Sequence, residues 1–281
     1  MTDYILTLAD WKQFGVFLQK EERSRATVEK YLRDTRKFYE FLGEERKINK
    51  EKVIAYKAFL KETYKVSSAN SMIAEVNCLL NWAGLGDFRV KSFKIQRQMF
   101  CCKEKVLEKE EYDRLVTLAR ENHNDRLELI MQTICSTGIR IGELPFITVE
   151  AAVQGVAKVQ CKGKQRIIFI PDKLRIYLLD YCRRKQIGKG TIFITRSGRP
   201  MNRVNVWTEM KGLCEAAGVE WMKVYPHNLR HLFARTCYRQ YKDIAYLADI
   251  LGHSSIETTR IYTVSSGEEH GRMVSKLDLV L

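Results

Sequence analysis

The residues in this sequence that are best suited to chemistry are a tyrosine and a few basic side chains in short motifs. Between Asp243 and Thr263, the stretch DIAYLADILGHSSIETTRIYT places His253 after a glycine that ends a predicted helix, and Tyr262 nine residues later. A tyrosine hydroxyl, with a pKa of ~10, attacks phosphorus only where a base or a field of positive charge helps it to lose its proton. An isolated helical tyrosine is usually a core or surface aromatic, so a functional interpretation of Tyr262 depends on its neighbours.

The segment Tyr225 to Arg235 supplies two further polar side chains near the start of a predicted helix. Pro226 favours the first turn of a helix, so His227 lies in that turn and Arg230 follows one turn later on the same face. A helix N-terminus attracts anions, because its backbone N–H groups and its dipole both favour negative charge. His231 is expected to point elsewhere and to pack in the core.

A second arginine lies in the motif TGIRIGEL, where Gly138 stops one predicted helix and Arg140 follows in a tight turn. A guanidinium between two isoleucines is an unusual surface feature, which favours a functional role. A buried structural ion pair between Arg140 and Glu143 is the alternative.

Residues 155–170 alternate in hydrophobicity and predict two strands joined by the basic tip KGKQR. A lysine at such a tip can reach into a groove and give up a proton there. Lys162 and Lys164 both belong to the tip, and for Lys164 a solvated turn is the favoured interpretation.

Together these motifs contribute two arginines, two histidines, a lysine and a tyrosine, without a cluster of carboxylates that could hold a metal. Fixed guanidinium groups neutralise the nonbridging oxygens of a phosphodiester, and a lysine can protonate a leaving 5′-hydroxyl. A covalent phosphotyrosine keeps the energy of the broken bond, so strands can be rejoined without ATP. The chemistry indicated is phosphoryl transfer without a metal or another cofactor.

The N-terminal half is predicted to be a four-helix unit, because its apolar residues recur at intervals of three and four. The predicted helices cover residues 7–20, 25–42, 50–63 and 67–83. Four basic residues of the second helix are candidate contacts to DNA phosphates: Arg25, Lys30, Arg33 and Lys37. The alternative is that they only form the solvated face of an amphipathic helix.

The predicted fold is mostly α-helical with a small antiparallel sheet (α+β), built as a two-domain clamp. It comprises a helical DNA-binding domain, a basic linker, a catalytic domain and a short amphipathic tail. These segments are assigned to residues 1–86, 87–106, 107–265 and 266–281.

The charge balance favours a polyanionic partner, since 48 lysines and arginines face 34 acidic residues, for a formal net charge of +14. Division after Gln98 gives 19 basic and 13 acidic residues before the cut and 29 and 21 after it, so both halves are basic. No apolar run approaches the ~20 residues that span a bilayer, and the first residues do not predict a signal peptide. The eight cysteines include no CxxC pair and predict reduced thiols rather than a metal site. We therefore expect a cytoplasmic protein that binds nucleic acid.

About residues 105–265 strongly resemble the tyrosine recombinases, that is, the phage-type integrases and Xer-like recombinases. The resemblance rests on an ordered set of residues: Arg140 in TGIRIGEL, Lys162 in CKGKQR, His227 and Arg230 in HNLRH, His253 in LGHSS and Tyr262 in TTRIYT. The N-terminal half resembles, less specifically, the core-binding domain of this family.

The resemblance implies a role for each residue of this set. Tyr262 would be the nucleophile that forms a 3′-phosphotyrosyl link with a DNA strand. Arg140 and Arg230 would hold the scissile phosphate, and His253 would form a hydrogen bond with it.

The same resemblance assigns supporting roles to residues around the phosphate. Lys162 would be the general acid, His227 a base or proton shuttle, and Glu143 an acidic residue that supports the site from behind. The hairpin is one residue shorter than a common KGxxKxR pattern, which leaves Lys164 as the alternative acid. Lys164 and Arg166 are otherwise expected to contact DNA.

The activity implied is site-specific recombination through a Holliday junction, which serves integration, excision, inversion or dimer resolution. A mobile element is one setting in which this activity is expected. The partners implied are double-stranded DNA with short inverted-repeat core sites and a homotetramer formed on paired sites, with a monomeric or weakly associated protein in the absence of DNA. The chain begins almost directly at the predicted core-binding domain, which favours a simple Xer-like architecture without an arm-binding domain. The tail is expected to dock on a neighbouring protomer, and folding back onto its own domain is the alternative.

Two other functions would use a similar sequence. A type IB topoisomerase relaxes DNA with similar chemistry, but the separate helical unit and the tail favour recombination. A DNA-binding regulator that has lost catalysis is disfavoured, because all six catalytic positions are filled.

Overall fold

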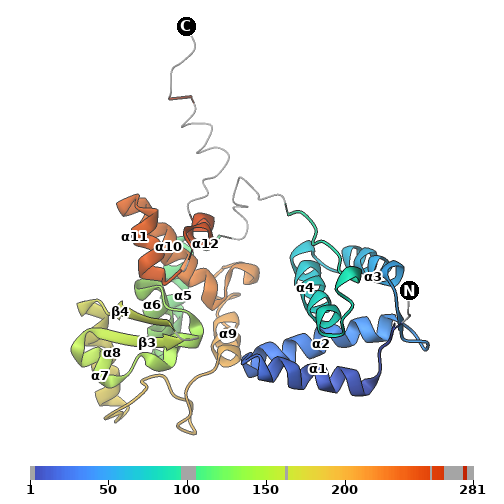
Figure 1. Cartoon of the computed structure of the whole chain (residues 1–281). Coiled ribbons are helices and arrows are strands. Elements are labelled where there is room, and N and C mark those ends of the chain that lie inside the picture. Colours follow the sequence, from blue (N-terminus) through green and yellow to red (C-terminus); the bar gives the residue numbers. More distant parts are fainter. Residues whose placement is uncertain (1–3, 96–105, 162–163, 254, 263–274, 277–281) are drawn as a thin grey trace. The chain divides into compact units, whose positions relative to one another are not determined.

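The computed structural model describes residues 4–95, 106–161, 164–253, 255–262 and 275–276 of the 281-residue chain. Lys162, the predicted general acid, and most of the predicted tail lie outside this part. The chain divides into two compact units, Met1–Arg97 and Gln98–Leu281, and each is described by itself. The prediction of a mostly helical protein with small antiparallel pairing is confirmed (Figure 1).

The described part of the N-terminal unit is built from four α-helices, which agree with the predicted segments to within one residue at each end. They are α1 (Leu8–Lys20), α2 (Arg25–Phe41), α3 (Lys50–Thr63) and α4 (Val66–Trp82), followed by the short 3₁₀ helix η1 (Gly86–Phe88). Strands β1 (Tyr4–Ile5) and β2 (Lys47–Ile48) pair antiparallel. The side chains of Thr7, Ser24 and Asn49 cap the first three helices by accepting a hydrogen bond from a backbone N–H. The apolar faces of the helices meet in one core around Phe14, Phe38 and Leu79.

The C-terminal unit contains the predicted hairpin among helices. Its α-helices within the described residues are α5 (Lys109–Glu121), α6 (Asp125–Thr137), α7 (Val149–Gln154), α8 (Asp172–Arg184), α9 (Arg203–Lys211), α10 (Pro226–Tyr241), α11 (Ile244–Leu251) and α12 (Ile256–Thr259). Its 3₁₀ helices are η3 (Ile141–Phe146), η4 (Trp221–Lys223) and η5 (Arg260–Tyr262). Strands β3 (Val156–Cys161) and β4 (Lys164–Phe169) pair antiparallel, with Val156 opposite Phe169 and Cys161 opposite Lys164. None of the helices described is long and apolar enough to cross a membrane.

Two glycines end the helices from which the central residues of the site emerge. Gly138 ends α6 with a φ of +64°, and a Cβ atom there would lie 2.4 Å from a ring carbon of Phe233 on α10. Gly252 ends α11 with a φ of +62°, and a Cβ atom there would lie 2.6 Å from Cδ of Arg166. Both positions require a backbone conformation and a close approach that only glycine provides without strain. Arg140 and His253 follow these turns directly, so their direction depends on them.

Candidate active site

Arg140 leaves the turn after α6 and is held by Glu143, one turn further along η3. Glu143 accepts hydrogen bonds from the backbone N–H of Arg140 (2.8 Å) and from its Nη1 (2.9 Å). Arg140 Nη2 donates to the backbone oxygen of Gly252 (3.3 Å). The Arg140 side chain nevertheless keeps 41% of its surface exposed, whereas that of Glu143 keeps 3%. Arg140 therefore combines the two predicted roles, because its guanidinium is paired with Glu143 and is still exposed to an anionic ligand.

Glu143 also binds the guanidinium of Arg166, which comes from the hairpin strand β4. Arg166 Nη2 donates to Glu143 Oε2, and Arg166 Nη1 donates to the backbone oxygen of Ile250 (2.8 Å). Burial raises the pKa of Glu143, but the hydrogen bond from the Arg140 backbone and the charge of Arg166 outweigh it and lower the pKa overall. This carboxylate therefore stays ionised and joins the hairpin to the turn that carries Arg140.

Arg230 is the most deeply buried cation of the site, with 1% of its surface exposed. Its Nη1 donates to the backbone oxygen of Gly138, and its Nη2 donates to that of Leu251 (2.8 Å). Burial and the positive charge of Arg140 lower the pKa of Arg230 to about 10, although Tyr262 acts to raise it. At neutral pH the guanidinium remains charged, and no carboxylate of the described residues is bonded to it. Such a cation attracts an anionic ligand strongly.

His253 links Arg230 to the segment that carries the tyrosine. Its Nε2 lies 3.0 Å from Arg230 Nη2, and its Nδ1 lies 2.8 Å from the hydroxyl oxygen of Thr259. Burial first, and then the charges of Arg230 and Arg140, lower the pKa of His253 to about 4. A neutral imidazole that accepts at Nε2 from the arginine must carry its proton on Nδ1 and donate it to Thr259. The histidine thus aligns the guanidinium and the start of the tyrosine segment together.

Tyr262 ends η5 and is 5% exposed, packed against Ala234, Leu247 and Leu251. The His253 ring stacks on the tyrosine ring at a centroid distance of 6.0 Å and an interplanar angle of 18°. The same imidazole lies 3.0 Å from Arg230 Nη2, so the tyrosine ring and the guanidinium are both neighbours of His253. The structure therefore brings Tyr262, Arg230 and His253 together, from residues that lie up to 32 positions apart in the sequence.

His231 is a member of this site that the sequence analysis assigned to packing elsewhere. Its ring meets the Tyr262 ring edge-on at a centroid distance of 4.9 Å, and it lies 4.6 Å from the ring of His227. Its Nε2 is buried and has no hydrogen-bond partner among the described residues. Burial and the neighbouring positive charges lower its pKa to about 4. The spacing of His227 and His231 could have indicated that both belong to the site, since residues four apart share a helix face.

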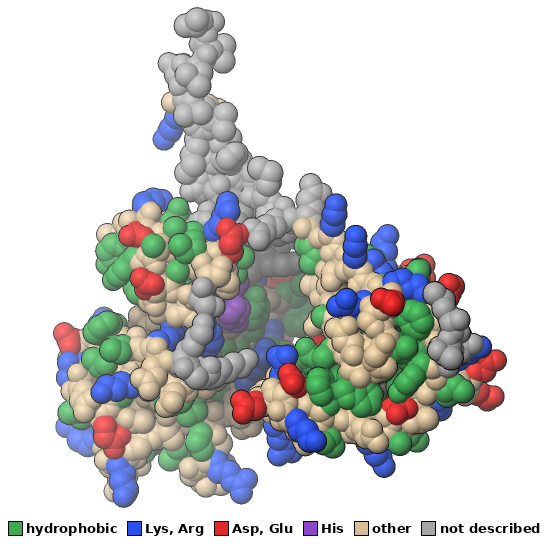
Figure 2. Space-filling model, in the orientation of Figure 1, with side chains coloured by type: hydrophobic (Ala, Val, Ile, Leu, Met, Phe, Trp, Pro, Cys, Tyr) green, Lys and Arg blue, Asp and Glu red, His purple; other side chains and the backbone are tan. Residues whose placement is uncertain are grey.

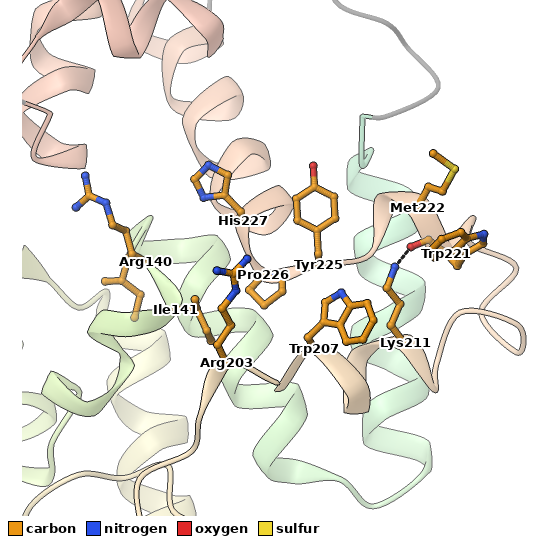
Figure 3. A pocket seen from close by; sticks show the side chains of 11 residues that line it. Arg140, Ile141, Arg203, Trp207, Lys211, Trp221, Met222, Tyr225, Pro226 and His227 are labelled. Carbon is orange, nitrogen blue, oxygen red and sulfur yellow. Dashed lines mark hydrogen bonds between the residues drawn. The ribbon is translucent and has the colours of Figure 1, made fainter. Parts of the chain in front are cut away.

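His227 lies at the exposed rim of the site, on the first turn of α10. Loss of solvent around the ring, and then the charges of Arg230, Arg140 and Arg203, lower its pKa. A neutral imidazole at this place can accept a proton. Arg203, at the start of α9, is a further cation of the site that the sequence analysis did not single out, and Figure 3 shows it beside Pro226.

The low pKa values predict that the C-terminal unit loses stability in mild acid. In the folded chain the pKa values of His231 and His253 are lowered from the ordinary 6.5 to about 4. Between these values the unfolded chain binds protons that the folded chain does not, so stability falls as the pH is lowered from 6.5 towards 4. Thermal unfolding at a series of pH values should show this slope, and His231→Phe, which keeps an aromatic ring against Tyr262, should reduce it. Equal slopes for the two proteins would contradict this assignment.

The remaining predicted site residues are placed as follows. Lys162 lies outside the described residues, and Lys164 is the first residue of β4, opposite Cys161. Arg166 turns towards Glu143 with 12% of its side chain exposed, so its position suits support of the site more than contact with DNA.

The basic residues of α2 that were predicted to contact DNA all have partners within the N-terminal unit. Lys30 Nζ donates to Asp34 (3.2 Å), to Ser71 (2.9 Å) and to the buried carboxylate of Glu75. Arg33 donates to Asp34, Lys37 to the hydroxyl of Tyr64 and Arg25 to Glu29. Figure 2 shows lysine and arginine side chains spread over the visible surface of both units. Exposed ion pairs such as that of Arg25, whose side chain is 93% exposed, are weak and can exchange for a phosphate.

Comparison with known proteins places the chain among the recombinases. The model of the phage integrase family matches residues 105–269. Tyrosine recombinase XerA of Thermococcus kodakarensis is 26% identical over 282 residues, which cover 95% of this chain and 96% of that protein. A lambda integrase(75-356) dimer bound to a COC' core site has a similar fold, with a TM-score of 0.74, 20% identity and coverage of 93% and 97% of the two chains. A lambda integrase tetramer bound to a Holliday junction gives a TM-score of 0.74 at 20% identity, over 93% of this chain and 78% of that one.

Proposed function

The chain belongs to the phage integrase family and is a tyrosine-type site-specific recombinase, and we propose that it cleaves and rejoins DNA through a 3′-phosphotyrosyl link at Tyr262. The observation that carries this assignment is that His253 contacts both the ring of Tyr262 and the buried guanidinium of Arg230. A phosphate held there would lie within reach of the hydroxyl, and the positive charge would favour the phenolate.

In the proposed reaction, Arg140 and Arg230 bind the nonbridging oxygens of the scissile phosphate. Both are fixed before DNA arrives, Arg140 by Glu143 and Arg230 by two backbone oxygens. Fixed donors need no reorganisation when charge develops in the transition state, which makes them effective. The phenolate oxygen of Tyr262 attacks phosphorus, the bond to the 5′ oxygen breaks, and the leaving 5′-hydroxyl takes up a proton.

The proton of the tyrosine is proposed to pass to a neutral histidine. The lowered pKa of His227 means that its imidazole is free to accept a proton at neutral pH. His253 would turn its Nε2 from Arg230 to the phosphate, and the negative charge of the phosphate would raise the pKa of the ring and favour donation.

We further propose that exchange proceeds through a Holliday junction in a homotetramer on paired inverted-repeat sites, as in the lambda integrase tetramer. An apolar groove of about 980 Å³ between the hairpin and α10 and α11 could receive the tail of a neighbouring protomer. Its rim carries the exposed side chains of Phe169 (74%), Ile167 (56%) and Tyr241 (62%). The tail sequence VSKLDLVL offers apolar residues to match, and only Ser275 and Lys276 of it belong to the described residues. In this scheme residues 1–86 are the DNA-binding half of a clamp joined through residues 87–106 to the catalytic residues 107–265.

The test is covalent trapping on DNA. A duplex site is selected from a randomised library by binding to the protein, and is then nicked so that the fragment released by cleavage diffuses away. The expected result is a protein–DNA adduct that survives denaturation, with the nucleotide attached to the peptide that contains Tyr262. An adduct at another residue, or none on a tightly bound site, would refute the proposal.

The general acid is proposed to be Lys162, with Lys164 as the alternative from the same hairpin. A 5′-phosphorothiolate leaving group needs no protonation, because a thiolate leaves easily. Lys162→Ala should therefore cleave the normal substrate slowly and the sulfur substrate at the rate of the unmodified protein, whereas Lys164→Ala should need no rescue. Single-turnover cleavage rates on the two substrates measure this, and the reverse pattern would exchange the two assignments.

A further inference from the structure

A pocket of about 480 Å³ lies on the C-terminal unit, beside the proposed phosphate site. Figure 3 shows Arg140 at one end, His227 and Arg203 between, and Trp221 and Met222 at the other end. Its size falls within the range of ~300–1,000 Å³ that is usual for pockets that bind small ligands. The mechanism proposed above uses only the end that carries Arg140 and His227.

The far end of the pocket combines exposed aromatic rings with an ammonium group. Trp207 on α9 is 43% exposed and Trp221 on η4 is 63% exposed. Lys211 Nζ lies 5.4 Å from the ring centroid of Trp207 and 4.6 Å from that of Trp221, and it donates to the backbone oxygen of Trp221. The lysine therefore links η4 to α9 and lies close to both indole rings. Trp207, Trp221 and Met222 line one pocket together, and exposed apolar groups that are gathered in this way and edged by polar residues often mark a binding site.

The chemistry of this end fits a flat aromatic ligand that is linked to an anion. Indole faces stack on nucleobases of any sequence, and an adjacent cation attracts the backbone phosphates. In an intact duplex the faces of the bases are covered by their neighbours, so a base can enter such a pocket only when it leaves the helix. A strand that is cut and exchanged has bases next to the break that can unpair.

We propose that the pocket between Trp207, Trp221 and Lys211 binds a single unpaired nucleobase of the DNA strand next to the phosphate held by Arg140. This inference rests on the proposed function, because it takes the position of the phosphate from it. The captured base holds the strand near the break in an unpaired state, ready for exchange with the partner site.

The test uses the Tyr262→Phe protein, so that binding is measured without cleavage. The probes are the selected duplex with one unpaired thymine at successive positions beside the cleavage point, and the same duplex fully paired. At one position the bulged duplex should bind about ten-fold more tightly than the paired one. Permanganate, which oxidises unstacked thymine, should attack the unpaired base in free DNA and not in the complex. Adding Trp221→Ala or Trp207→Ala should remove the preference and restore the oxidation.

Two controls separate stacking from general damage. Trp221→Phe keeps an aromatic face and should retain most of the preference, and Val204→Ala removes an exposed (66%) apolar side chain of α9 that is outside the pocket. An equal loss of binding to both duplexes would mean that the tryptophans touch an intact helix, and a loss seen only in multi-protomer complexes would mean that they contact a neighbouring protein. Either result overturns the proposal. The absence of a covalent adduct with the unmodified protein would instead refute the proposed function alone.

Discussion

Replacement of Tyr262 by phenylalanine is expected to abolish covalent attachment to DNA, with a loss in the rate of strand cleavage on the order of 10⁴-fold or more. The change removes the only atom of the residue that can attack phosphorus. The ring would keep its packing against Ala234, Leu247 and Leu251 and its edge contact with His231, so the fold should persist. Affinity for the duplex should therefore remain close to that of the unmodified protein.

Denaturing gels measure the adduct, and a binding titration on the same duplex measures affinity. Tyr246→Phe is the matched control, because Tyr246 is a 47% exposed tyrosine of the adjoining helix α11 and its hydroxyl has no proposed role in the reaction. It should leave cleavage unchanged. Cleavage by Tyr262→Phe at an undiminished rate would assign the nucleophile to another residue, and a parallel loss of DNA binding would mean that the hydroxyl organises the site.

The helices and the central motifs could be predicted from the sequence because each depends on local signals. Apolar periodicity predicted the helices of the N-terminal unit, and Gly138 and Gly252 indicated where two helices of the other unit end. The convergence of Tyr262 with Arg230 could not be derived from such signals, because it depends on how α10, α11 and η5 pack. The family resemblance supplied that step.

Arg166 shows why side-chain direction was harder to predict than strand position. The run IIFI is apolar at every position, so its pattern does not say which side of the hairpin faces inward. In the structure Ile168 is buried and Ile167 is exposed, and Arg166, two residues before Ile168, shares the inward side. Arg166 of the hairpin therefore binds Glu143, the carboxylate that also holds Arg140.

This support leads to the second large expected effect, which is a loss of about 3–5 kcal/mol in the free energy of unfolding of the C-terminal unit on Glu143→Gln. The side chain of Glu143 is 3% exposed, and its two oxygens accept three hydrogen bonds from Arg140 and Arg166. The amide group of glutamine would direct an N–H at one of these donors. It would also leave two guanidinium groups without their common anion, close to the buried charge of Arg230.

Chemical denaturation of the two proteins measures the loss, and Glu128→Gln is the matched control. Glu128 is also largely buried (12% exposed), but its partner Arg120 is 62% exposed, so water can solvate the guanidinium when the negative charge is lost. This control should lose about 1 kcal/mol or less. Cleavage by Glu143→Gln should fall even at temperatures where the protein is folded, because Arg140 loses the contact that directs it towards the phosphate. A stable Glu143→Gln protein with full activity would show that the backbone turn after Gly138 positions Arg140 without this carboxylate.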